Sequence, residues 1–83
     1  MNDKEIKTTL LKLLQKIAPE IEPDLLDDDE DIRETYGIDS YDFLQFIVGL
    51  DDAYGIETPE EDYGKISTLR ALIDYIKLAK EQT

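Results

Sequence analysis

The sequence predicts an all-α fold, a four-helix bundle with three longer helices, a short third helix and a long loop between the first two. Apolar side chains recur at helical spacing in three separate stretches, and no alternating pattern typical of a strand extends beyond a few residues. A chain of 83 residues has room for one hydrophobic core, so we expect a single domain over residues 1–83.

The first longer helix is predicted to begin after Asn2. Asn2 and Glu5 have the spacing of a capping box, in which each side chain pairs with the other residue's backbone N–H. One apolar stripe follows, formed by Ile6, Leu10, Leu13, Leu14 and Ile17. Pro19 and Pro23 end the helix, because proline lacks the backbone donor that a helix needs.

Residues 18–38 are predicted to form an ordered crossover loop with room for one helical turn. Its apolar side chains are numerous enough to hold it across the bundle: Leu25, Leu26, Ile32 and Tyr36. The second longer helix starts near Asp39 and Ser40 and ends at Tyr54, where Gly55 can adopt the left-handed conformation.

The second longer helix is apolar on more than one side. Its predicted core face consists of Leu44, Ile47, Leu50 and Tyr54. The side chains expected largely outside that face are Tyr41, Phe43, Phe46 and Val48. This excess of apolar surface suggests that the helix contacts more than the core.

The short third helix is predicted from a cap at Thr58, with Pro59 in the first helical position and Gly64 at its end. The last helix begins after Ser67 or Thr68. Its apolar positions are Leu69, Leu72, Ile73 and Ile76, and a polar tail follows over residues 77–83.

The composition excludes several classes of function. Asp and Glu number 21 against 9 Lys and Arg, for a net charge of −12, and no basic face for nucleic acid is evident. The chain has no Cys and no His, which excludes disulfides, thiolate nucleophiles and imidazole bases, and we expect no enzyme. Without a signal peptide or a membrane-spanning run, it is expected to be a cytoplasmic monomer that does not insert into membranes.

The acidic run Asp27–Asp31 resembles the start of a calcium-binding loop. The rest of such a loop is missing, since Ile32 and Ile38 stand where the turn glycine and the bidentate glutamate belong. We therefore expect a solvated acidic loop with no specific metal site, although weak binding of divalent cations stays open.

The most informative stretch runs from Gly37 to Asp42. In a structural interpretation Asp39 caps the second longer helix and Asp42 favours the positive end of its dipole. In a functional interpretation the Ser40 hydroxyl is then free to point outward, where unpaired backbone N–H groups favour an anion such as a phosphodiester.

Taken together, several motifs resemble the acyl carrier protein family over nearly the whole chain. They are Asp31-Ile32-Arg33-Glu34 leading into Tyr36-Gly37-Ile38-Asp39-Ser40, Leu50-Asp51-Asp52-Ala53-Tyr54-Gly55-Ile56, Thr58-Pro59-Glu60-Glu61-Asp62, Lys65-Ile66-Ser67-Thr68-Leu69 and Leu72-Ile73-Asp74-Tyr75-Ile76. The resemblance implies that Ser40, next to Asp39, carries 4′-phosphopantetheine taken from coenzyme A by a phosphopantetheinyl transferase. The thiol of that arm would hold acyl intermediates as thioesters for enzymes of fatty-acid, polyketide or related specialised biosynthesis.

The resemblance also implies an acidic docking face for acyl-transferring and acyl-modifying enzymes that carry basic patches. The predicted partner-binding residues are Asp39, Tyr41, Asp42, Phe43, Asp51 and Asp52. Tyr41 replaces the family's usual leucine and Gln45 its usual glutamate, which favours a specialised pathway. Phe43 is expected to project from the helix, either as an anchor for a partner or packed on the crossover loop.

Two alternatives remain at this point. A peptidyl or aminoacyl carrier has the same fold, but such carriers are usually less acidic and often have His or Gly before the serine, where this chain has Asp39. An acidic interaction protein could also keep the fold without ever being modified. Whether Ser40 is modified distinguishes such an interaction protein from a carrier.

Overall fold

The computed structural model of the chain describes residues 2–22 and 26–81, and over these residues it contains helices and loops without strands. The elements in chain order are α1 (Asp3–Ile17), α2 (Ile32–Tyr36), α3 (Ser40–Tyr54), the 3-10 helix η2 (Glu60–Lys65) and α4 (Leu69–Glu81). The predicted all-α bundle with three longer helices is confirmed. Pro23 and Leu25, which we assigned to the crossover, lie outside the described residues.

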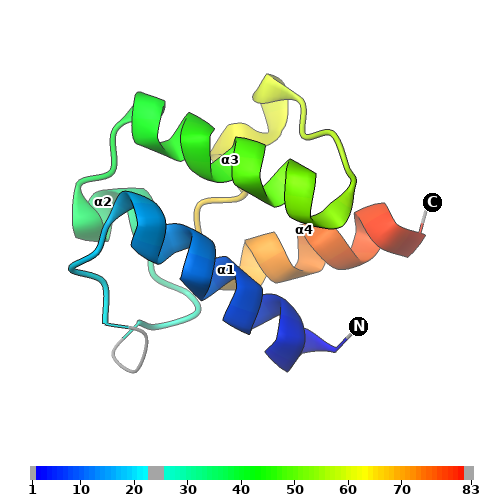
Figure 1. The fold of residues 1–83 in the computed structure, drawn as a ribbon, viewed down its shortest axis with the longest axis horizontal. Helices are drawn as coiled ribbons and strands as arrows, with labels where there is room; N and C mark the ends of the chain where they lie inside the picture. The colour runs from blue at the N-terminus through cyan, green and yellow to red at the C-terminus, as the bar shows by residue number, and fades with distance from the viewer. Residues whose placement is uncertain (1, 23–25, 82–83) are drawn as a thin grey trace.

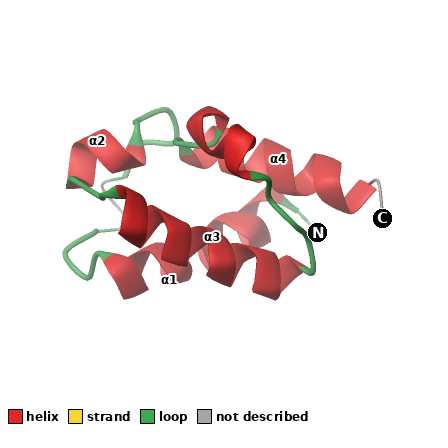
Figure 2. Cartoon of the chain, turned by 90° about the horizontal axis from the view of Figure 1, so that it is seen from above, coloured by secondary structure: helices red, strands yellow, loops and turns green. Residues whose placement is uncertain are grey.

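The three longer helices enclose one hydrophobic core. Helix α1 packs against both α3 and α4, and it runs in the opposite direction to α3 (Figure 1). Viewed from above, α2 lies at one end of the molecule, near the start of α3, while both termini lie toward the other end (Figure 2). The central core side chains are fully buried: Ile6, Leu10, Leu14, Ile32, Leu50, Leu69, Leu72 and Ile76.

The predicted cap of α1 is confirmed. The side-chain oxygen of Asn2 accepts a hydrogen bond from the backbone N–H of Glu5 at 2.9 Å, which satisfies one of the donors left free at the start of a helix. At the other end the N–H of Ala18 donates to the carbonyl of Leu14. The helix therefore ends at Ile17, and after the cap residue Ala18 the next residue, Pro19, has no backbone donor to continue it.

The crossover contains a complete short helix, α2. Asp31 caps it by accepting the N–H of Glu34 at 3.0 Å, and Gly37 ends it at a φ of 62°. Backbone hydrogen bonds then tie the crossover to the start of α4, since Ile32 donates to the carbonyl of Ser67 and Arg70 donates to the carbonyl of Asp28. The long connection is thus held by backbone pairing as well as by apolar side chains.

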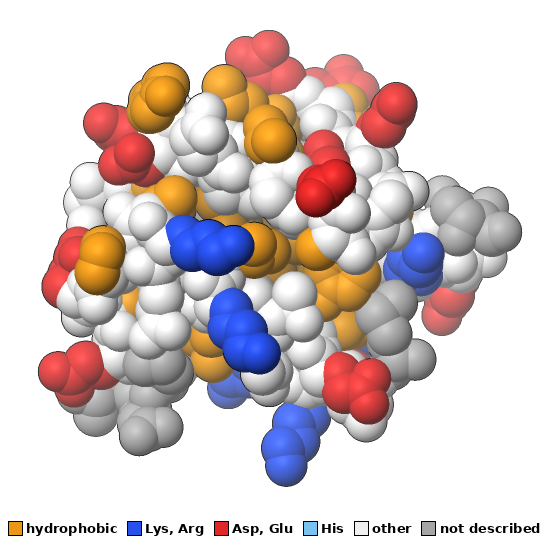
Figure 3. All heavy atoms as spheres, viewed as in Figure 1, with side chains coloured by type: hydrophobic (Ala, Val, Ile, Leu, Met, Phe, Trp, Pro, Cys, Tyr) orange, Lys and Arg blue, Asp and Glu red, His pale blue; other side chains and the backbone are white. Residues whose placement is uncertain are grey.

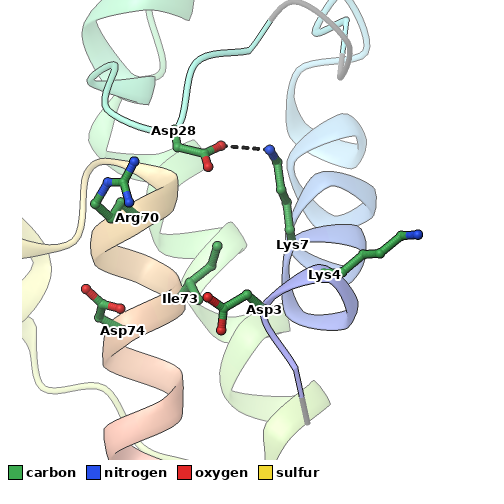
Figure 4. A pocket seen from close by; sticks show the side chains of 7 residues that line it. All are labelled: Asp3, Lys4, Lys7, Asp28, Arg70, Ile73 and Asp74. Carbon is green, nitrogen blue, oxygen red and sulfur yellow. Dashed lines mark ion pairs between the residues drawn. The ribbon is translucent and has the colours of Figure 1, made fainter.

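The acidic run before α2 is exposed at Asp27, Asp29 and Glu30, as expected for a solvated loop, and two of its carboxylates also pair with cations on helices. Lys7 of α1 reaches Asp28 at 2.7 Å (Figure 4), and Arg70 of α4 contacts Asp29 at 2.6 Å. The hydrogen bond from Arg70 holds the pKa of Asp29 below its usual value. The ion pairs of Asp28 and Asp29 attach the crossover to α1 and α4. Over residues 2–22 and 26–81 no group of acidic side chains is arranged to hold a metal ion.

The predicted core face of α3 is confirmed at Ile47 and Leu50, and Tyr54 packs against the core, but the prediction is wrong at Leu44. The buried residues of α3 are Phe43, Phe46, Ile47 and Leu50, whereas Leu44 is 41% exposed. Phe43 and Phe46 were placed outside the core because apolar residues occur on both sides of this helix, and the sequence alone does not say which stripe faces inward. Tyr41 and Val48 are exposed as expected.

The short third element is a 3-10 helix, and Thr58 does not cap it. No side chain caps its start, because the Thr58 hydroxyl instead donates to Asp51 at 2.6 Å. Gly64 lies inside the helix rather than closing it, and it has no positive φ. The last helix does begin with a threonine cap, since the Thr68 hydroxyl oxygen accepts the N–H of Ala71.

Charged side chains of both signs cover the surface. On the face shown in Figure 3, acidic groups lie mostly around the rim, with lysine or arginine groups nearer the middle and lower edge.

Among the helices that the structure describes, none combines the length and the apolar character needed to cross a membrane.

The turn after α3 provides a test of the fold. Gly55 has a φ of 65°, so Gly55→Ala forces a side chain into the left-handed region and is expected to cost about 1 kcal/mol of unfolding free energy. The melting midpoint should fall by about 4–8 °C, measured by circular dichroism. Gly64→Ala is the matched control, because a Cβ there meets no atom within 4 Å. Equal melting midpoints for Gly55→Ala and Gly64→Ala would contradict the left-handed conformation assigned to Gly55.

Candidate functional site

The candidate site is the tight turn that joins α2 to α3. Gly37 reverses the chain in the left-handed conformation, and the side chain of Ile38 is buried beneath the turn. Asp39 then caps α3, with its Oδ1 accepting the N–H of Asp42 at 2.8 Å. These three residues fix where Ser40 begins the helix, as the structural interpretation of this stretch predicts.

Ser40 is exposed at the first position of α3. Since Asp39 provides the cap, the Ser40 hydroxyl is not used for capping. Its Oγ instead accepts a hydrogen bond from Nη2 of Arg33 at 3.2 Å. The oxygen therefore lies at the surface beside a positive charge, where it is open to chemistry with an anionic reagent.

Arg33 is a site residue that the sequence patterns did not indicate. It lies seven positions before Ser40, on α2, and its guanidinium lies 4.9 Å from the centre of the Phe43 ring. A guanidinium over an aromatic face is a favourable cation–π arrangement. The available signal was the rarity of arginine, since Arg33 and Arg70 are the only two in the sequence.

A shallow pocket of about 480 Å³ opens beside the serine. Its walls come from α2, α3 and η2, and they combine aromatic, aliphatic and charged side chains: Arg33, Ser40, Tyr41, Phe43, Leu44, Glu60 and Tyr63. Such a surface can accept an arm that is polar at its attachment and less polar further along.

Phe43 does not project from α3, which corrects our expectation of an exposed aromatic anchor. Its side chain is only 1% exposed. The ring packs against Phe46 at a centroid distance of 5.9 Å and against Tyr63 at 6.0 Å. In the crossover the ring contacts Arg33. Phe43 therefore forms the floor of the site and is not available to contact a partner protein.

Asp51 also has a different environment from the one predicted. It is half-buried, and its carboxylate accepts both the N–H and the hydroxyl of Thr58, at 3.1 and 2.6 Å. In the structure Asp51 therefore holds the loop after α3, whereas Asp39 and Asp52 are exposed and Asp42 is half-exposed.

An apolar stripe runs along the outer side of α3, where the sequence predicted Tyr41 and Val48 but not Leu44. Tyr41, Leu44 and Val48 are 69%, 41% and 56% exposed. Their spacing of three and four residues places them on one face of the helix. Asp52, four residues after Val48, continues this stripe, while Asp39 and Asp42 lie at the start of the helix. We call these six residues together the outer face of α3; they combine negative charge with apolar contact area.

Comparisons with known proteins agree on one family. The family model for a phosphopantetheine attachment site matches residues 8–76. An acyl carrier protein of Rubrobacter xylanophilus is 38% identical over 72 residues, covering 78% of this chain and 88% of that protein. Among solved structures, an acyl carrier protein from Enterococcus faecalis, described for its high thermal stability, matches with a TM-score of 0.75 and 32% identity over 95% of this chain and 99% of the other.

The internal role of Asp51 can be separated from a docking role by stability. Asp51→Ala leaves the buried Thr58 without its acceptor, so we expect a loss of about 1–3 kcal/mol of unfolding free energy in urea titration. Asp52→Ala removes the same charge from the neighbouring exposed position and should change the unfolding free energy by less than about 0.5 kcal/mol. If both variants unfold at the same urea concentration, the hydrogen bonds to Thr58 contribute nothing to stability.

Proposed function

The chain belongs to the acyl carrier protein family, and from that premise we propose that Ser40 is the residue to which its 4′-phosphopantetheine is attached. Members of the family carry acyl groups as thioesters on that arm and are not catalysts. They work with a phosphopantetheinyl transferase and with acyl-handling enzymes. The thiol belongs to the prosthetic group, which explains how a chain without Cys or His can serve acyl chemistry.

One observation carries the proposal: the hydroxyl of Ser40 is released from capping and exposed at the start of α3, inside the matched family region. Attachment would form a bond between Ser40 Oγ and the pantetheine-side phosphorus of coenzyme A. The pyrophosphate P–O bond breaks, adenosine 3′,5′-bisphosphate leaves, and the serine proton passes to a base of the transferase. The chain itself supplies only the positioned hydroxyl.

The outer face of α3 is the surface that we propose for partner docking. Its carboxylates at Asp39, Asp42 and Asp52 would attract the basic patches of acyl-handling enzymes, which speeds encounter more than it adds affinity. Tyr41, Leu44 and Val48 supply the apolar area that slows dissociation. An acidic face that begins at Ser40 would bring a docked enzyme close to the arm, as an acyl carrier requires.

The attachment site is tested by intact mass. After incubation with coenzyme A and a phosphopantetheinyl transferase, the wild type should gain the mass of one phosphopantetheine and Ser40→Ala should gain none. Ser67→Ala is the matched control, because Ser67 is the only other serine in the sequence, and it should gain the full mass. An unmodified wild type would favour the acidic interaction protein instead.

The docking surface is tested by association kinetics with the transferase. Asp42→Asn removes one charge from the outer face of α3, and we expect association at low salt to slow by about two- to fivefold. Asp74→Asn removes the same charge from an exposed position on α4 and should leave the rate unchanged. Tyr41→Ala should instead raise the dissociation rate by about fivefold. Equal association rates for Asp42→Asn and Asp74→Asn would rule out electrostatic steering by this face.

A further inference from the structure

We propose that Arg33 binds the phosphodiester of the prosthetic group on Ser40. The prosthetic group is then held by the Arg33 guanidinium as well as by its covalent bond to Ser40. This inference rests on the attachment at Ser40 proposed above. It assigns a ligand-binding role to a residue on α2, outside the helix that carries the serine.

The position of Arg33 is the first argument. Its Nη2 lies 3.2 Å from Ser40 Oγ, to which it donates a hydrogen bond. In the modified protein the phosphorus is bonded to that same Oγ, and the two anionic oxygens of the phosphodiester lie one P–O bond further out. An ester oxygen is a poorer acceptor than the anionic oxygens beside it, so the guanidinium has a stronger acceptor within reach.

The orientation of the guanidinium is the second argument. It lies over the ring of Phe43, at 4.9 Å from the centroid, and that ring is buried against Phe46 and Tyr63. A planar guanidinium supported on a fixed aromatic ring loses less freedom when it binds a phosphate than a free side chain does. The core of the bundle therefore holds this cation in place beside the serine.

The charge balance of the chain also favours an anionic ligand at Arg33. The chain carries a net charge of −12, and the cations Lys7, Arg70 and Lys77 each pair with a carboxylate. Arg33 has no carboxylate within ion-pair distance among the residues that the structure describes; its contacts there are Ser40 Oγ and the Phe43 ring. An arginine without a carboxylate partner among the described residues, and next to Ser40, is available for an anionic ligand.

The start of α3 gives the phosphodiester less help than a helix N-terminus usually would. The N–H of Asp42 already donates to the side chain of Asp39, and Asp39 itself brings a negative charge next to Ser40. An added phosphodiester meets repulsion from this carboxylate, which a nearby guanidinium offsets. Arg33 is also the only cationic side chain among those that line the pocket beside Ser40.

The two arginines make the proposal testable in the unaltered protein. A nitrogen–proton correlation spectrum of the arginine Nε–H groups has two signals, one from Arg33 and one from Arg70. On conversion to the phosphopantetheine form, the Arg33 signal should shift and its proton should exchange with water about two- to fivefold more slowly, as expected for an exposed ion pair. Arg70 pairs with Asp29 and does not line the pocket beside Ser40, so its signal should not change.

Phosphorus resonance of the modified protein provides the complementary readout. The phosphodiester signal should move in Arg33→Gln, move less in Arg33→Lys, and stay at the wild-type position in Arg70→Gln. Intact mass is recorded for every sample, so that loss of attachment is seen separately. A wild type that gains no mass would overturn the attachment at Ser40 and this inference with it. A full mass gain with unchanged Arg33 exchange and an unchanged phosphorus signal in Arg33→Gln would overturn this inference alone.

Discussion

The site depends on a sharp reversal of the chain between α2 and α3, made in only three residues. Gly37 supplies the left-handed conformation, Ile38 inserts into the core, and Asp39 closes the turn by capping α3. If any of these contributions were lost, α2 and α3 would change their relative angle. Ser40 and Arg33 sit on opposite sides of this turn, so its geometry decides whether the hydroxyl and the guanidinium meet.

Many of the acidic side chains in this chain have structural partners, which helps to explain how a domain with a charge of −12 stays compact. Asp31 and Asp39 accept hydrogen bonds from backbone N–H groups at the starts of helices. Asp51 accepts two hydrogen bonds from Thr58 and so holds the loop after α3. Asp39 thus combines a cap with a place on the outer face of α3, where Asp42 and Asp52 are the other carboxylates. Several acidic side chains therefore have a structural role in addition to any contact with partners.

The sequence predicted the features that depend on local chemistry. The caps at Asn2 and Asp39 and the glycine end at Gly55 involve neighbours in the chain, and the structure confirms them. Predictions failed where a distant residue decides the outcome: Thr58 bonds to Asp51 seven residues earlier rather than capping η2. Leu44 was misassigned to the inward face of α3 because apolar residues lie on both sides of that helix, and contacts with other elements, such as that of Phe43 with Tyr63 of η2, decide which side is buried. The pairing of Arg33 with Ser40 could not be predicted because it requires the turn to be folded.

Phe43 contacts both the core of the bundle and the Arg33 guanidinium beside Ser40. A buried position of this size could be filled by leucine or methionine at modest cost, yet only an aromatic ring also presents a face to the guanidinium of Arg33. Position 43 therefore serves two purposes, since the same ring fills the core and supports the guanidinium beside Ser40. A change of core packing at this position would also alter the surroundings of the serine.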